Sequence, residues 1–444
     1  MTAHAARPLR KILGLGFGLA IVFGGTVGVG ILRLPGVIAG ALGDPALVVL
    51  FWLIGGLYAL LGAVSVAELA TMFPEAGGFR VYARRAFGNG VGFVIGWCDW
   101  LCNVSALAYG AMTAATFFTV LWPIAGADSK WIALTIISIF TLLHWVGLRL
   151  GSTLTSFISM SVGLMLMALV VGCFLAPPVA ATTATMEGTA ASLPLASMGM
   201  LAVVVMALRS VLVAYDGWYS AIYMAEENTD PGRTLPRAII GGTLLVITVY
   251  LLINVAFLRV LPLPVLAAAE LPAAEAARIL LPDGGPALVT VISLLTVLSL
   301  VNATMLMAPR ILLAIGRDGY LTPGAAGVSE SGTPRAALGA SSLAVMLLVL
   351  TGTFEQIIAL AAVLFMLLYI SAYCAVFVLR RREPTLPRPF RAPGFPVTTA
   401  IVLLGSVAFL VAAVIEDRRS AMIAVGFIAL CSIAYVWRER VRRA

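Results

Sequence analysis

Two hydrophobic segments of this chain are interrupted by residues that hold a helix poorly. The first runs from Ile21 to Leu32 and contains four glycines, and the second, Leu212 to Tyr219, reads Leu-Val-Ala-Tyr-Asp-Gly-Trp-Tyr. In lipid every backbone N–H and C=O needs a partner, so a broken helix at membrane depth is tolerated only where it lines a cavity or binds something. Two such breaks in corresponding positions of two halves indicate the substrate site of a transporter.

Composition places the whole chain in a membrane. Of its 444 residues, 61% are hydrophobic and 11% are charged, whereas a soluble domain is about 25% charged. Apolar runs of about 20 residues recur along the entire length, as membrane-spanning helices require. The net charge of +8 comes from arginines in short loops between these runs. Membrane topology explains that charge, so the lipid bilayer is the expected partner and nucleic acid is not.

The pattern predicts an all-α integral membrane protein with 12 transmembrane helices, because no segment shows the period-two alternation of a membrane barrel. The expected spans are residues 13–39, 46–72, 88–122, 130–147, 152–175, 197–227, 236–262, 285–316, 335–351, 354–380, 394–415 and 419–438.

Lysine and arginine are distributed unevenly between alternate loops. If the N-terminus is cytoplasmic, 21 of the 28 basic residues lie on the cytoplasmic side, five lie outside and two lie within spans. Short cytoplasmic loops carry such an excess. We therefore expect a multi-pass protein of the cell (inner) membrane whose N-terminal tail, 1–12, and C-terminal tail, 439–444, are both cytoplasmic.

The two broken segments belong to spans one and six and so have opposite orientations. Spans one to five, residues 13–175, and spans six to ten, residues 197–380, would then form a five-plus-five inverted repeat. Residues 394–438 would add spans eleven and twelve.

Four motifs resemble those of the amino acid–polyamine–organocation transporters, in particular the L-type amino acid transporter branch and its bacterial relatives. They are Gly-Thr-Val-Gly-Val-Gly-Ile-Leu at 25–32, the Ala-Glu-Leu to Tyr segment at 67–82, Ala-Tyr-Asp-Gly-Trp to Pro at 214–236, and the segment from Asn302 through Arg310 to Leu321. The resemblance extends from span one to span ten. It implies an amino acid permease with the LeuT-like inverted-repeat fold and broken helices 1 and 6.

A free amino acid carries a carboxylate and an ammonium, and an interrupted helix can bind both without a formal charge. The exposed amides at the start of a half-helix attract an anion, and the carbonyls at the end of the other half attract a cation. We assign the carboxylate to the amides around Gly28, Val29 and Gly30, and the ammonium to carbonyls near Val27, Ala214 and Tyr215. The expected substrate-binding set is Thr26, Val27, Gly28, Val29, Gly30, Ile31, Ala214, Tyr215, Asp216, Gly217 and Trp218.

Asp216 and Trp218 have two interpretations each. The Asp216 carboxylate either contacts a substrate ammonium or caps backbone amides locally. Trp218 is either a wall or gate of the pocket or a packing aromatic.

Five further polar residues within spans are gating or coupling candidates. Arg33 and Arg209 lie on the outer halves of the broken spans, where each either pairs with an acid, which we favour, or forms a positive vestibule that steers carboxylates. Asp99 is a buried acid that carries a proton or bonds Asn103, one turn further along, and we favour the structural bond. Asn302 belongs to the eighth-span motif.

The sequence departs from the family at span five, where many relatives carry a lysine and this chain has Val162. That departure puts a lysine-based proton mechanism in doubt. Hydroxyls of Thr155, Ser159 and Ser299 offer hard oxygen ligands that suit sodium. Exchange, proton symport and sodium symport therefore all remain open, and we expect no cofactor and no resident metal ion.

Other functions fit less well. Two histidines and no nucleotide-binding Gly-x-x-x-x-Gly-Lys motif argue against an enzyme and against ATP-driven transport. A transporter-like amino acid sensor would bind tightly without moving its ligand. A cationic amino acid or polyamine transporter of the same fold remains an alternative because of Asp216.

Overall fold

The computed structural model describes residues 8–123, 128–178, 200–352 and 354–443, and within these ranges regular structure is helical. The described residues contain no β-strand beyond a single bridge between Leu13 and Asn228. The expected all-α class is confirmed.

Nine described helices are long and apolar enough to cross a membrane. They are α3 (Pro45–Met72), α5 (Asn89–Leu121), α6 (Ser129–Val146), α7 (Leu148–Leu175), α9 (Pro231–Val260), α12 (Gly285–Arg317), α14 (Phe354–Arg382), α15 (Val397–Glu416) and α16 (Arg418–Arg443). The chain is therefore a multi-pass membrane protein.

The remaining expected spans are a bent pair and two shorter helices. The helices α1 (Leu15–Thr26) and α2 (Gly30–Leu42) meet at 47° and together are long enough to span. The shorter apolar helices are α8 (Met200–Ala214) and α13 (Arg335–Thr351). Each of the twelve expected segments thus contains a helix.

Short helices occupy connections that the sequence analysis left unassigned. They are α4 (Phe79–Phe87), α10 (Leu263–Ala268), α11 (Pro272–Leu280) and the 3₁₀ turn η3 (Pro323–Ala326). A proline stands in the first turn of α10, α11 and η3, where its missing N–H costs nothing. These elements are too short to show the periodicity that identifies a span.

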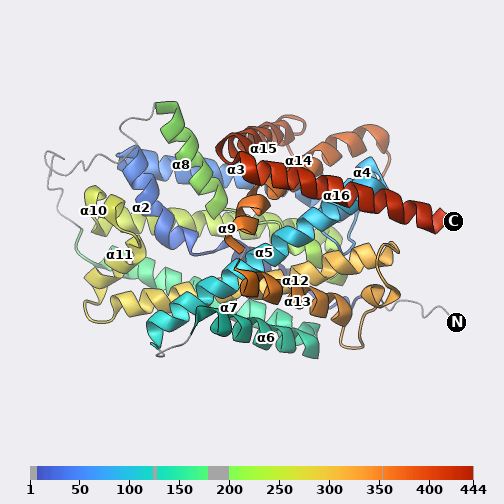
Figure 1. Cartoon of the computed structure of the whole chain (residues 1–444). Helices are drawn as coiled ribbons and strands as arrows, with labels where there is room; N and C mark the ends of the chain where they lie inside the picture. Colours follow the sequence, from blue (N-terminus) through green and yellow to red (C-terminus); the bar gives the residue numbers. More distant parts are fainter. Residues whose placement is uncertain (1–7, 124–127, 179–199, 353, 444) are drawn as a thin grey trace.

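The helices form one bundle around α5 and α12, which pack along each other (Figure 1). On one side of this pair, α9 packs against both α1 and α3, while α7 contacts α1 and α12. The helix α1, which leads into the first break, is therefore packed among continuous helices.

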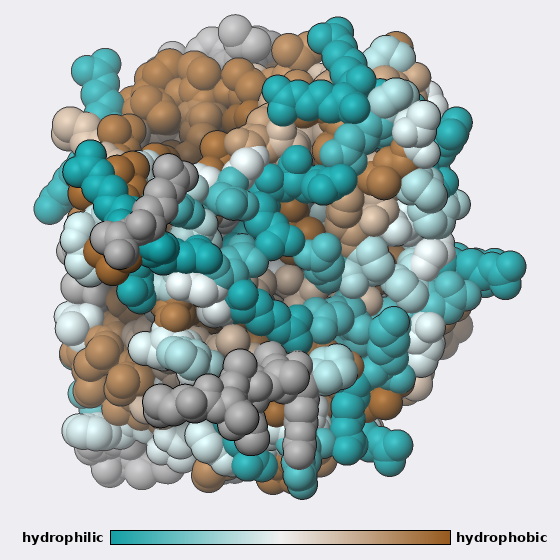
Figure 2. All heavy atoms as spheres, turned by 90° about the vertical axis from the view of Figure 1, so that its right-hand side faces the viewer, coloured by the Kyte–Doolittle hydropathy of each residue, from teal (hydrophilic) through white to brown (hydrophobic). Residues whose placement is uncertain are grey.

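One end of the bundle, which we call the basic end, carries α4, η3 and the last turns of α14 and α16. The last turns of α16 lie at this end in Figure 1. The backbone N–H of Leu13 donates to the Glu227 carbonyl at 3.0 Å, and Arg442 donates to the Asp318 carbonyl at 3.1 Å. Figure 2 shows hydrophilic side chains gathered over this end, with apolar residues beside them.

Ion pairs tie the helices together at the basic end. Arg310 of α12 binds Glu227 through two hydrogen bonds of 2.9 and 3.1 Å, and both side chains are buried. Glu68 of α3 binds Arg380 of α14 at 2.5 and 2.9 Å. Arg80 of α4 pairs with Asp318. Burial lowers the pKa of the Arg80 guanidinium below its usual value, and the Asp318 carboxylate opposes that shift.

Replacing Glu227 with glutamine should destabilise the bundle strongly. Glu227→Gln leaves the Arg310 guanidinium buried without its counter-charge, which costs about 3–5 kcal/mol. Thermal unfolding in detergent should show a clear fall in Tm. The control is Glu275→Gln, which removes an exposed pair with Arg278 on α11 worth at most about 1 kcal/mol. Equal Tm values for the two variants would contradict the prediction.

Candidate functional site

The first helix break separates α1 from α2 at residues 27–29. Thr26 ends α1, Val27 is extended (φ −72°, ψ 103°), and α2 begins at Gly30 with no side chain capping its start. The first amides of a helix have no partner within that helix. Gly28, Val29 and Gly30 are partly exposed, whereas Thr26, Val27 and Ile31 are buried. The amide end of α2 is therefore open at the break.

The second break follows α8. The helix ends at Ala214, residues 215–219 form turns, and a 3₁₀ helix, η2 (Ser220–Glu227), continues the chain toward the basic end. Gly217 has a φ of +111°, a conformation that side-chain-bearing residues rarely adopt. The Ser220 hydroxyl donates to the Gly217 carbonyl at 2.6 Å. Glycine at 217 thus permits the chain to turn out of α8.

The two breaks lie directly against each other. A Cβ atom on Gly217 would stand 2.1 Å from the Gly25 carbonyl oxygen, and one on Gly25 would stand 2.3 Å from the Ser220 hydroxyl. This close backbone contact brings the end of α1 beside the turn after α8.

Tyr250 of α9 joins the two breaks. Its hydroxyl lies 3.1 Å from the Thr26 carbonyl oxygen and 3.0 Å from the Ala214 carbonyl oxygen. A hydroxyl has one proton and donates to one carbonyl at a time. The carbonyl groups at the ends of α1 and α8 therefore both point toward the Tyr250 hydroxyl, close to the open amide end of α2. The carbonyls offer negative partial charge and the amides offer positive partial charge.

Asp216 lies between aromatic side chains. Its carboxylate accepts hydrogen bonds from the Tyr369 hydroxyl and, at 3.4 Å, from the Tyr219 hydroxyl. Trp218 is buried and stacks on Tyr369 with ring centroids 5.7 Å apart. The Tyr215 side chain instead points to α3, where its hydroxyl donates to the Trp52 carbonyl at 3.1 Å.

Arg33 and Arg209, the two arginines in the outer halves of the broken spans, differ in whether they form an ion pair. Arg209 pairs with Glu416 of α15, and both side chains are exposed. Arg33 is exposed, and no described residue forms an ion pair with it. Arg209 is thus paired, as favoured from the sequence, whereas Arg33 has no such partner in the part of the chain that the structure describes.

Asp99 and Asn103 contact each other, as their spacing suggested. The Asn103 amide donates to Asp99 Oδ1 at 3.0 Å, and the Tyr223 hydroxyl donates to the same oxygen at 2.7 Å. Both residues are buried. Asp99 therefore links α5 to η2, the continuation of the second break.

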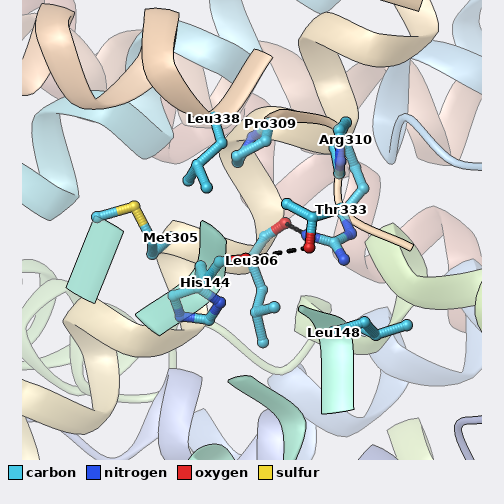
Figure 3. A pocket seen from close by; sticks show the side chains of 9 residues that line it. His144, Leu148, Met305, Leu306, Pro309, Arg310, Thr333 and Leu338 are labelled. Carbon is cyan, nitrogen blue, oxygen red and sulfur yellow. Dashed lines mark hydrogen bonds between the residues drawn. The ribbon is translucent and has the colours of Figure 1, made fainter. Parts of the chain in front are cut away.

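The Asn302 side chain forms hydrogen bonds to neighbouring helices rather than to the breaks. Its amide donates to the Thr155 hydroxyl at 2.7 Å, and its Oδ1 lies 2.8 Å from His144 Nε2. A small cavity adjoins this network (Figure 3), where the Thr333 hydroxyl donates to the His144 carbonyl and Arg310 donates to the Leu306 carbonyl. The cavity lies among α6, α7, α12 and α13, away from both breaks.

The three hydroxyls considered for sodium do not form one cluster. Ser159 donates to the Ala20 carbonyl of α1 at 2.8 Å and lies 3.3 Å from the Ser299 hydroxyl. Thr155 instead donates to the Gly151 carbonyl at 2.9 Å. Val162 is buried.

Sequence reasoning missed Tyr250 and Tyr369, the side chains that bind the two breaks. Each is a tyrosine in the middle of an apolar helix, and a buried phenol generally needs a hydrogen-bond partner. That requirement could have identified them as polar contacts at membrane depth, although it would not have named their partners.

The fold and the paired breaks are typical of a membrane transporter. Residues 18–437 match the family described as "Amino acid permease", and the chain belongs to this family. It is 25% identical over 447 residues to the serine/threonine exchanger SteT of Bacillus subtilis, with 98% of each chain covered. Its relatives in this family are transporters and not enzymes.

Two mammalian relatives are similar over most of the chain. The b(0,+)-type amino acid transporter 1 of Mus musculus is 26% identical, with 92% of this chain and 84% of the relative covered. The large neutral amino acids transporter small subunit 2 of Oryctolagus cuniculus is 29% identical, with 86% of this chain and 72% of the relative covered.

Adding one methyl group at Gly217 should separate the two breaks. In Gly217→Ala the new carbon would collide with the Gly25 carbonyl, and the φ of +111° would become strained, at a cost of about 1–3 kcal/mol. If that cost falls on the transport step, we expect the rate of amino acid uptake into proteoliposomes to fall about tenfold.

The matched control is Gly352→Ala. Gly352 also has a positive φ, +69°, but a Cβ there would meet open space. Uptake by Gly217→Ala equal to that of Gly352→Ala would contradict the contact between the breaks.

Proposed function

We propose that the protein is a secondary active transporter that moves amino acids across the cell membrane by alternating access. The contact between the two helix breaks carries this proposal. The open amides at Gly28–Gly30 would bind the substrate carboxylate, and the carbonyls of Thr26 and Ala214 together with Asp216 would bind its ammonium.

The partial exposure of the site supports this assignment. Gly28, Val29, Gly30 and Asp216 are partly exposed, whereas Trp218, Tyr219 and Tyr223 on the side of the basic end are buried. Ion pairs further join α3, α4, η2, α12 and α14 at that end. This arrangement fits a state that is closed toward the basic end.

The proposed topology follows the sequence. Twelve spans, counting α1 with α2 and α8 with η2, would form two inverted repeats, 13–175 and 197–380, followed by the pair at 394–438. The excess of arginine at the basic end supports a cytoplasmic location for that end and for both termini.

Exchange is the proposed mode of transport. The chain is similar over its whole length to a bacterial exchanger, and Val162 stands where many relatives carry the span-five lysine. Neutral amino acids are the proposed substrates. Cationic ones are the second candidate, because Asp216 accepts hydrogen bonds from two tyrosines whose rings pack against Trp218, and aromatic rings favour cations.

The first test is uptake of radiolabelled amino acids into proteoliposomes. With an exchanger, uptake should require an unlabelled internal amino acid and should stay near background in empty vesicles under an imposed proton or sodium gradient. Vesicles without protein are the control. Gradient-driven uptake into empty vesicles would overturn exchange in favour of symport, and high-affinity binding without uptake would identify a sensor.

Arg33 should steer substrate carboxylates more than Arg209 does. Arg33→Ala removes an exposed cation without an ion-pair partner among the described residues, whereas Arg209→Ala removes one already paired with Glu416. At low salt Arg33→Ala should raise KM about twofold to fivefold, and the effect should vanish at high salt because exposed charges are screened. The Arg209→Ala KM should change less. An unchanged KM for Arg33→Ala at low salt would contradict steering.

A further inference from the structure

Asp99 is a buried carboxyl group with one oxygen left unsatisfied. Its side chain is fully buried in α5. Oδ1 accepts hydrogen bonds from Tyr223 and Asn103, whereas Oδ2 has no hydrogen-bond partner within the part of the chain that the structure describes. The backbone N–H of Phe79 at the start of α4 also faces the carboxyl group, so a carboxylate here would be held by neutral donors alone, with Oδ2 the less satisfied oxygen.

Among the described residues, the cations on elements packed around α5 that come near Asp99 are already paired. Arg80 of α4 lies along Gly96, one turn before Asp99, but its guanidinium pairs with Asp318. Arg310 of α12 pairs with Glu227, and His144 of α6 bonds Asn302. The remaining titratable neighbours are neutral phenols and thiols or a second acid: Tyr82, Cys98, Cys102, Tyr219, Tyr223 and Asp216, with Tyr369 of α14 and Cys431 of α16 beyond them.

These surroundings favour a neutral Asp99. Burying an unpaired carboxylate at membrane depth costs several kcal/mol, and a bound proton removes that cost. The proton belongs on Oδ2, because Oδ1 already accepts from two donors. Asp216 does not share this condition, since both of its oxygens accept hydrogen bonds from tyrosines.

The position of Asp99 connects its proton to the conformational cycle. Tyr223 lies in η2, the continuation of the second break toward the basic end, whereas Asp99 lies in α5, which packs along α12. An opening of the basic end that carries η2 away from α5 would separate these two elements. That movement breaks the bond between Tyr223 and Asp99 and admits water to Oδ2.

We propose that Asp99 is a proton-binding site whose proton holds the basic end closed and leaves when that end opens. The inference rests on the proposed transport function. In the step itself the O–H bond at Oδ2 breaks, the proton passes to water, and the carboxylate becomes hydrated; closure reverses the step. The ligand is the proton, and Tyr223 acts as a positioning residue.

The test is the pH profile of amino acid exchange in proteoliposomes equilibrated to equal pH on both sides. Between about pH 6 and about pH 9 the wild-type rate should fall about tenfold, because alkali removes the proton that closes the basic end. Asp99→Asn keeps an oxygen that accepts from Tyr223 and cannot lose a proton, so its rate should stay flat. Asp128→Asn, at an exposed cap of α6, is the matched control and should follow the wild type.

A second variant and a second readout keep the test decisive. Tyr223→Phe removes a donor that stabilises the carboxylate, so its profile should shift to higher pH. Fluorescence of Trp97 and Trp100, which flank Asp99 and contact each other, should show a pH transition in purified wild-type protein and none in Asp99→Asn, whether or not transport occurs. Coincident wild-type and Asp99→Asn curves in both measurements would overturn the proton site. Absence of uptake with a fluorescence transition that requires Asp99 would overturn only the transport function.

Discussion

The rest of the structure depends on one constraint, which is that lipid cannot pair with backbone N–H and C=O groups. Wherever this chain interrupts a helix at membrane depth, protein must supply the missing partners. Tyr250 supplies one for the carbonyls of Thr26 and Ala214, and Ser220 supplies one for Gly217. The open amide end of α2 receives no side-chain cap. This leaves a place inside the bundle where a carboxylate could be bound.

Formal charge is arranged differently at the basic end and at the breaks. At the basic end, buried carboxylates and guanidinium groups occur in close pairs, as in Glu227 with Arg310 and Glu68 with Arg380. At the breaks there are instead the partial charges of helix ends, tyrosine hydroxyls and the carboxylate of Asp216. A zwitterion needs both signs within a few ångströms, and helix ends provide them without the several kcal/mol that an unpaired buried ion costs. The ion pairs at the basic end can then have a separate role, which is to hold that end closed.

Much of the fold could be predicted from the sequence, since twenty-residue apolar runs have few alternatives in a membrane protein. The positions of both breaks were also predictable, because Gly28, Gly30 and Gly217 interrupt runs that are otherwise good helices. The contacts between segments were not. Nothing local indicates that Gly217 meets Gly25 or that Tyr250 reaches both breaks, since these contacts depend on packing between distant helices. The short helices α4, α10 and α11 were missed because nine residues or fewer carry little periodic signal. Arg33 and Arg209 look alike in sequence, yet only Arg209 has an acid within reach among the described residues.

The bond between Asp99 and Tyr223 joins α5 to the segment that follows the second break. Tyr219 and Tyr223 are one helical turn apart, and their rings contact each other. The first binds Asp216 at the break, and the second binds Asp99 in α5. Any movement of Asp216 toward a substrate ammonium would therefore act on the same short segment that holds Asp99. That segment ends at Glu227, which is paired with Arg310, so the proposed substrate site, the proposed proton site and the ion pairs of the basic end are all joined to residues 219–227. Residues 219–227 thus make three contacts with different parts of the bundle, to Asp216, Asp99 and Arg310.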